Sequence, residues 1–154
     1  MPGSTATNSF YKEVMDFVML NTSPPLSGIT SFYVALCTSG TTLSNAMLQS
    51  YSEVGSGVGY ARVAINRSST ASGGTAGWQY NTGNLEYSNN ADIVFGVPTA
   101  NWGTIVGVGL FKSSTIGSTD MMYYAALTSS KVINNGDGAP KILAGQLRIA
   151  RATC

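Results

Sequence analysis

The chain has 154 residues, enough for one domain with a substantial hydrophobic core, and only 10% of them are Asp, Glu, Lys or Arg, against about 25% in ordinary soluble domains. Eight basic and seven acidic side chains give a formal net charge of +1, so no strong field attracts nucleic acid or an acidic membrane surface. The absence of histidine excludes Ser-His-Asp and Cys-His catalysis and removes most transition-metal sites.

Residues 1–7 are small and polar, and we expect them to form a flexible arm ahead of a single domain over residues 8–154. The domain begins with a helix predicted over residues 8–21, which starts on good N-cap residues and is followed by Pro24-Pro25. Four apolar residues recur at helical spacing along it: Phe10, Val14, Phe17 and Val18. Few polar side chains remain on this helix, so we expect a sheet or a neighbouring subunit to cover it.

The rest of the domain consists of short apolar or alternating segments separated by Gly, Asn, Ser and Pro turns. Strands are predicted at 30–38, 60–65, 78–80, 85–87, 91–95, 102–111 and 121–127, and a closing hairpin is predicted from 131–133 and 141–150. This pattern predicts a mainly β fold: an antiparallel β-sandwich, jelly-roll-like or Greek-key, with one N-terminal α-helix.

We expect the rest of the chain to be arranged around residues 91–127. Within them, the apolar segment 102–111 is predicted to form a central strand buried on both faces. It is too short to cross a membrane and contains three glycines. Because glycine has no side chain, another group must lie close against this strand. Both the chain's own opposite sheet and a second subunit are candidates for that group.

The remaining side chains offer little catalytic chemistry. A carboxylate pair could come only from loop residues such as Glu53, Glu86 and Asp92, and nothing in their spacing favours one. Cys37 and Cys154 show no metal or redox spacing, and we interpret them as a buried thiol and a free terminal thiol. We therefore expect no enzyme activity, no catalytic residue, no metal and no cofactor.

Two groups of residues are candidates for binding. Trp78, Tyr80 and Tyr87 would suit an aromatic platform for a sugar, although cross-strand pairing within a hairpin is the favoured interpretation. Three arginines lie on strands or at their ends, where they could form ion pairs between subunits or be solvated. The predicted interface consists of the four apolar helix residues and these three arginines: Phe10, Val14, Phe17, Val18, Arg62, Arg148 and Arg151.

Several short motifs occur in an order that resembles a family of small virion proteins of tailed bacteriophages. In chain order they are FYVALCT at 32–38, GYAR at 59–62, PTANWGT at 98–104, GVGLF at 107–111, AAL at 125–127, and NNGD with AGQLRI at 134–149. Members of that family include capsid decoration, cement, minor tail and fibre proteins. The acidic loop that members commonly carry after the first strand is absent here, where the sequence is TSGTT at 38–42.

The resemblance and the low charge together predict a structural protein held by its neighbours. The main expectation is a capsid decoration (cement) protein that binds the major capsid protein on the virion surface as a homo-oligomer, a dimer or trimer. A tail, collar or fibre component is the first alternative, and a glycan-binding module of a receptor-binding structure is the second. No secretion signal is recognised at the N-terminus, so synthesis in the host bacterial cytoplasm is expected, without nucleic-acid or membrane partners.

Overall fold

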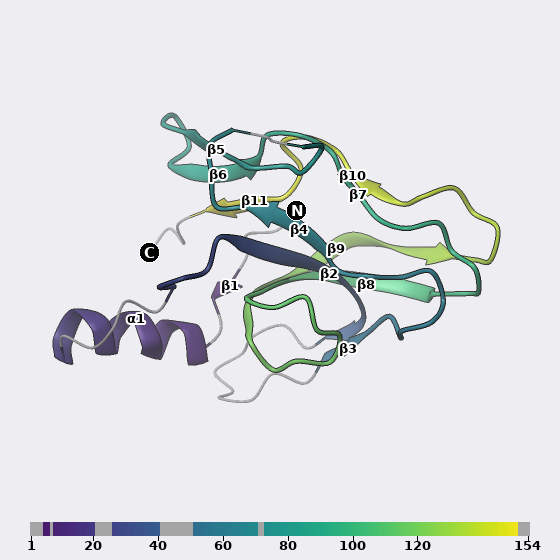
Figure 1. Ribbon diagram of the computed structural model, residues 1–154, viewed down its shortest axis with the longest axis horizontal. Helices are drawn as coiled ribbons and strands as arrows, with labels where there is room; N and C mark the ends of the chain where they lie inside the picture. Colours follow the sequence, from purple (N-terminus) through teal and green to yellow (C-terminus); the bar gives the residue numbers. More distant parts are fainter. Residues whose placement is uncertain (1–4, 7, 21–25, 41–50, 71–72, 151–154) are drawn as a thin grey trace.

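The computed structural model of the chain describes residues 5–6, 8–20, 26–40, 51–70 and 73–150. These residues form one helix and three antiparallel sheets (Figure 1). The predicted mainly β, sandwich-like fold with a single N-terminal helix is therefore confirmed.

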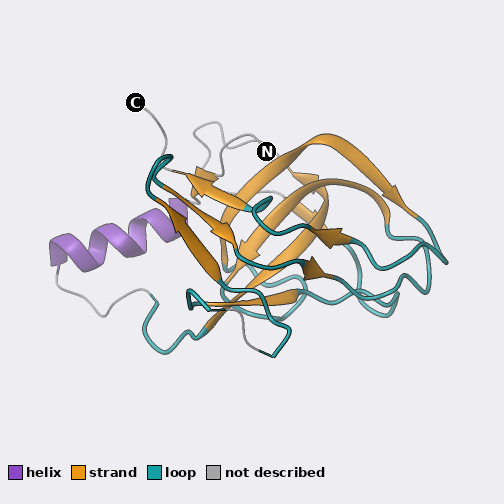
Figure 2. Cartoon of the chain, turned by 90° about the horizontal axis from the view of Figure 1, so that it is seen from above, coloured by secondary structure: helices purple, strands orange, loops and turns teal. Residues whose placement is uncertain are grey.

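Helix α1 (Asn8–Leu20) matches the predicted helix closely, because its apolar residues repeat at the helical period. Its first half attaches to the sheets. The ring of Phe10 meets that of Tyr123 edge to face at 5.5 Å between centroids, and Lys112 Nζ lies 2.5 Å from Glu13 Oε1. Its second half extends away from the body of the domain (Figure 2).

The largest sheet contains six strands. They are β1 (Thr5–Ala6), β2 (Ser31–Gly40), β3 (Tyr51–Glu53), β4 (Val63–Asn66), β8 (Gly103–Phe111) and β9 (Met121–Ile133). Their order is β1-β9-β8-β2-β3, and β4 also pairs with β2. Since β8 occupies one side of β2 along 33–37, β3 and β4 lie end to end along its other side.

Strand β1 lies within the arm that was expected to be flexible. Its backbone pairs with Tyr123 and Tyr124 of β9, at the free edge of the large sheet. An open strand edge offers unpaired N–H and C=O groups, and β1 satisfies some of them. Residues 5–6 of the arm form this strand, and its other residues lie outside the described part of the chain.

Two smaller sheets lie over one face of the large sheet (Figures 1 and 2). One joins β5 (Trp78–Asn81), β6 (Glu86–Asn89) and β11 (Arg148–Ala150), and the other joins β7 (Ile93–Val94) and β10 (Lys141–Ile142). Strands β5 and β6 form the hairpin that the sequence predicts. Its turn is held by Asn81 Oδ1, which accepts hydrogen bonds from the backbone N–H groups of Gly83 and Asn84 at 3.0 and 3.3 Å.

The predicted closing hairpin is wrong. Residues 131–133 continue β9, whereas the segment 141–150 divides into β10 and β11, which pair with β7 and β6. The division is made by Asn89, whose fully buried side chain donates to Leu143 O at 3.0 Å and accepts from Leu147 N at 2.9 Å. This side chain stabilises a turn between the two strands and directs each to a different sheet.

The main hydrophobic core fills the space between the layers. It takes alternate residues of the central strands and the inward residues of the smaller sheets, including Val34, Leu36, Ile93, Phe95, Trp102, Ile105, Val108, Leu110 and Met122. The alternation places one side of each central strand in this core and the other side on the opposite face of the large sheet.

That opposite face explains two of the three glycines of β8, Gly107 and Gly109. A Cβ on Gly107 would lie 2.4 to 2.6 Å from atoms of the Tyr124 ring, and one on Gly109 would lie 2.6 Å from Phe111 Cε2. Real Cβ atoms do not approach so closely, so rings from β8 and β9 occupy the space that the glycines leave. The close group is therefore neither the opposite sheet nor a second subunit.

Candidate functional site

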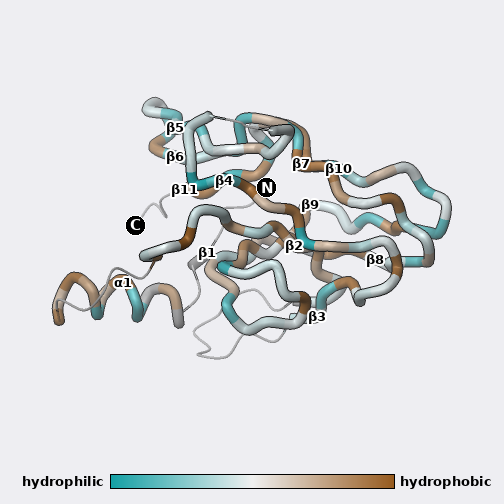
Figure 3. Tube along the Cα trace, viewed as in Figure 1, coloured by the Kyte–Doolittle hydropathy of each residue, from teal (hydrophilic) through white to brown (hydrophobic). Residues whose placement is uncertain are grey.

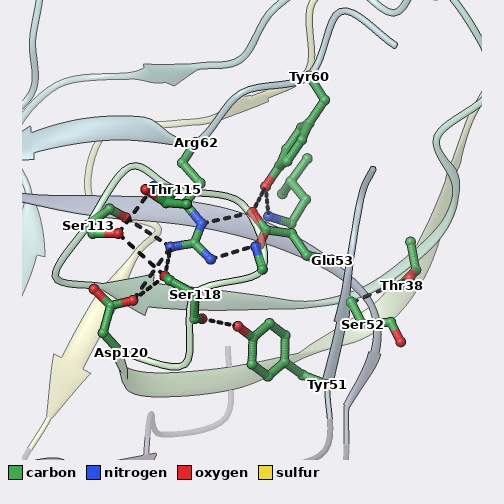
Figure 4. A network of polar contacts seen from close by, with 12 residues as sticks. Thr38, Tyr51, Ser52, Glu53, Tyr60, Arg62, Ser113, Thr115, Ser118 and Asp120 are labelled. Atoms are coloured by element: carbon green, nitrogen blue, oxygen red, sulfur yellow. Dashed lines mark hydrogen bonds and ion pairs between the residues drawn. The ribbon is translucent and has the colours of Figure 1, made fainter. Parts of the chain in front are cut away.

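Arg62 and Glu53 form a buried ion pair beside the large sheet (Figure 4). Arg62 Nη2 donates to Glu53 Oε2 at 2.8 Å and Arg62 Nε to Glu53 Oε1 at 2.9 Å, with side-chain exposures of 0% and 3%. This two-point geometry is the strongest that arginine makes with a carboxylate. It connects β3 to the segment that leads into β4.

The same arginine holds the loop between β8 and β9. Its Nη1 donates to Ser113 O at 2.8 Å and to Ser118 Oγ at 2.9 Å, and lies 3.7 Å from Asp120 Oδ1. Its Cζ lies 3.5 Å from the centroid of the Phe111 ring. Each nitrogen of the guanidinium thus has a partner inside the chain.

Tyr60 completes this buried polar cluster. Its hydroxyl donates to Glu53 Oε1 and accepts from Leu36 N, each at 2.9 Å. Burial raises the pKa of Tyr60 well above its ordinary value, and the charge of Glu53 adds to that rise. Burial alone would lower the pKa of Arg62, but hydrogen bonds to Glu53 and its charge outweigh that effect and raise the pKa. The cluster holds its charges fixed and satisfied, which suits stabilisation of the fold.

Arg62, one of the residues predicted for the interface, lies buried within this cluster. Tyr60, two residues earlier, is buried as well. Arg148, in contrast, is half exposed on β11, where its Nη1 lies 3.2 Å from Glu86 Oε1. Arg151 lies outside the described residues, and the two described arginines pair with different carboxylates.

The three carboxylates considered for catalysis do not form a pair. Each makes its own ion pair with a different cation: Glu53 with Arg62, Glu86 with Arg148, and Asp92 with Lys141 at 3.1 Å. Hydrogen bonds from Ala144 N and from Lys141 hold the pKa of Asp92 below its usual value. Among the described residues, no group of three or more His, Cys, Asp or Glu side chains could hold a metal ion.

The second half of α1 carries the most exposed apolar side chains of the predicted interface. We call residues 17–20 the α1 tip; Val18, Met19 and Leu20 are 65 to 70% exposed there, and Phe17 is less so. The tube in Figure 3 is coloured mainly as hydrophobic at this end of α1. The tip contains no charged residue. Phe10 and Val14, by contrast, pack within their own chain, so the four predicted helix residues divide between the core and the surface.

A second feature is an open cavity of about 650 Å³, here called the aromatic groove, between the first turn of α1 and the β5–β6–β11 sheet. Its lining comprises Phe10, Leu26, Phe32, Arg67, Ser68, Ser69, Trp78, Tyr80, Tyr87, Met122, Tyr123 and Ile149. Tyr80 and Tyr87 face each other across β5 and β6, with ring centroids 4.9 Å apart. The predicted cross-strand aromatic pair is thus confirmed, and the same two rings line the groove.

Cys37 is expected to be unreactive in the folded protein. It is fully buried, and burial raises its thiol pKa from 9.0 to about 12, so almost no thiolate exists near neutral pH. At pH 8, iodoacetamide should leave Cys37 unmodified in the native chain and modify it in the denatured chain, as measured by mass spectrometry of its peptide. Rapid modification of the native chain would contradict this placement.

The same shift predicts loss of stability at alkaline pH. The unfolded thiol ionises near pH 9.0 while the folded thiol stays neutral until about 12, so unfolding releases a proton between these values. The free energy of unfolding should therefore fall as the pH rises from 9.0 towards 12, and the raised pKa of Tyr60 acts in the same direction. Denaturant titrations across this range measure the slope.

No helix within the described ranges is long and apolar enough to cross a membrane. No curated protein sequence matches the chain. The family described as Podophage GP4 fiber I protein gp80 matches residues 5–150, all but the first four and last four residues. The chain therefore belongs to this family and is a fibre-type structural protein of a phage virion.

Proposed function

We propose that the chain works as a non-enzymatic component of a phage fibre, built into the virion through contacts with other copies of itself. The observation that carries this proposal is the α1 tip, whose apolar side chains have no cover within the described chain. Large apolar side chains that extend from a domain typically mark a surface for protein contact.

Self-association is favoured by the charge of the chain. The tip is uncharged, and the formal net charge is only +1, so equivalent copies repel each other weakly. Contact between equivalent surfaces around one axis gives a closed dimer or trimer. A partner with a complementary charge is not needed for such a contact.

The family membership supports a fibre or tail position more than the capsid decoration that the sequence first suggested. In this proposal the principal partner is the chain itself, with an adjoining virion protein at the point of attachment. The major capsid protein becomes the partner only in the decoration alternative. Nucleic acid and membrane have no part in the proposed role, and synthesis in the host cytoplasm precedes assembly.

The number of copies of this chain in each purified particle tests whether it lies in a fibre or on the capsid. Quantitative mass spectrometry should find far fewer copies of this chain than of the major capsid protein, because fibres attach at few points on a particle. A ratio near one copy for each capsid subunit would instead support decoration and contradict the fibre proposal. Absence of the chain from purified particles would contradict both.

A further inference from the structure

The aromatic groove contains a cation that has no acidic partner among the described residues. Most described lysines and arginines pair with a carboxylate within 4.0 Å, but Arg67 and Lys131 do not. Arg67 lies in the groove lining, which includes no Asp or Glu. The groove is therefore complementary in charge to a ligand that carries one negative group.

Arg67 is held in place with part of its guanidinium unused. Its Nη1 donates to Leu26 O at 2.8 Å and to Ile29 O at 2.5 Å, and its Cζ lies 5.4 Å from the centroid of the Phe32 ring. Its Nε and Nη2 have no acceptor among the described residues. These two nitrogens form the edge of arginine that binds a carboxylate through two parallel hydrogen bonds.

The rest of the lining fits a ligand with both apolar faces and hydroxyl groups. Tyr80 and Tyr87 each leave about half of their surface exposed and present ring faces and phenol groups, while Ser68 and Ser69 add hydroxyls near the cation. Trp78 is buried, and its Nε1–H has no hydrogen-bond acceptor, which is costly for a buried donor. The volume of about 650 Å³ is in the range of small-ligand sites.

We propose that the aromatic groove binds an acidic saccharide. The carboxylate of a uronic acid accepts two hydrogen bonds from Arg67, and the C–H faces of the sugar rings pack on Tyr80 and Tyr87. Sugar rings meet both requirements of the lining, since each has apolar C–H faces and hydroxyls at its edge. This binding goes beyond the proposed assembly through the α1 tip and does not depend on it.

The test uses the full chain, short oligogalacturonides, and the same oligosaccharides with their carboxyl groups reduced to alcohols. Calorimetric titration should detect binding of the acidic probe to the wild-type chain. Arg67→Gln should weaken that binding about ten- to a hundredfold, because it removes hydrogen bonds to a charged group. Reducing the carboxyl groups of the probe should weaken its binding to the wild-type chain by a similar factor. In Arg67→Gln, the same reduction should cause little further weakening.

Lys131→Gln is the matched control, because it removes the other unpaired cation from β9, outside the groove lining. It should leave affinity for the acidic probe unchanged, and Tyr80→Ser should weaken the acidic and reduced probes alike. Arg67 also anchors residues 26–29. Comparing the acidic and reduced probes separates the loss of this anchoring role from the loss of the hydrogen bonds to the ligand's carboxylate. An equal loss for both probes in Arg67→Gln would overturn the proposed carboxylate contact.

Three other results would also overturn the proposal: no binding of the acidic probe at millimolar concentration, equal weakening by Lys131→Gln, or preference for a polyglutamate peptide over the acidic sugar. Arg67→Gln leaves the α1 tip intact and should enter virions at normal occupancy. Failure of saccharide binding is thereby distinguishable from failure of assembly.

Discussion

Replacing Arg62 with alanine is expected to lower the free energy of unfolding by about 3–5 kcal/mol, the cost of leaving one partner of a buried ion pair without its counter-charge. Glu53 would keep a carboxylate that is 3% exposed and lacks its two-point partner. The loop between β8 and β9 would lose its bonds to Nη1 as well. Equilibrium unfolding in urea measures the change.

Arg148→Ala is the matched control for this experiment. Its ion pair with Glu86 is partly exposed, with 48% of the Arg148 side chain accessible, and such pairs contribute about 0–1 kcal/mol. A double replacement, Glu53→Gln with Arg62→Met, should recover part of the loss because it leaves no unpaired buried charge. Equal destabilisation by Arg62→Ala and Arg148→Ala would contradict a structural role for the buried cluster.

Replacing Val18 with aspartate is expected to prevent self-association while the domain stays folded. A charge at the centre of an apolar contact typically costs at least about 2 kcal/mol, which weakens association roughly thirtyfold or more. Val18 is 65% exposed in the single chain, so its replacement should leave the thermal midpoint nearly unchanged. Sedimentation across a range of concentrations measures the oligomer.

Val97→Asp provides the same substitution at another exposed valine, 58% accessible and distant in sequence from the helix. It should leave both association and incorporation into virions as in the wild type. If Val18→Asp associates as strongly as Val97→Asp, the α1 tip is not the assembly surface. If Val18→Asp unfolds the monomer, the residue belongs to the core instead.

The sequence predicts features whose signals are local. Helix α1 repeats its apolar residues over consecutive turns, and the β5–β6 hairpin has a turn rich in Asn and Gly between aromatic segments. Two of the three glycines of 102–111, Gly107 and Gly109, correctly indicate a close neighbour, whereas Gly103 has none. The expectation of no enzyme activity, which rests on the absence of histidine, stays a prediction.

Features that depend on distant contacts are not predictable in this way. The split of 141–150 into two strands depends on Asn89, more than fifty residues earlier. The sequence places Tyr60 and Arg62 two residues apart in a predicted strand, but it cannot reveal that Glu53 and the 112–120 loop contact them. Likewise, helical spacing groups Phe10 with Phe17 without showing that only Phe10 packs against Tyr123.

The aromatic groove, too, depends on contacts between residues that are distant in the sequence. Trp78, Tyr80 and Tyr87 are close in sequence and can be selected as a group. Arg67 cannot be added to them from sequence, because it reaches the groove through a fold that joins residues 26–32 to the segment after β4. A site assembled from separate segments becomes visible only when the segments are placed in space.

A reconstruction of the purified virion at side-chain resolution tests the central claim most directly, because it locates the α1 tip among its neighbours. We predict that the chain lies in a fibre and that Val18, Met19 and Leu20 are buried against another copy of the chain. A chain on the capsid shell, or a fibre subunit whose α1 tip faces solvent while another surface makes the contacts, would contradict this account.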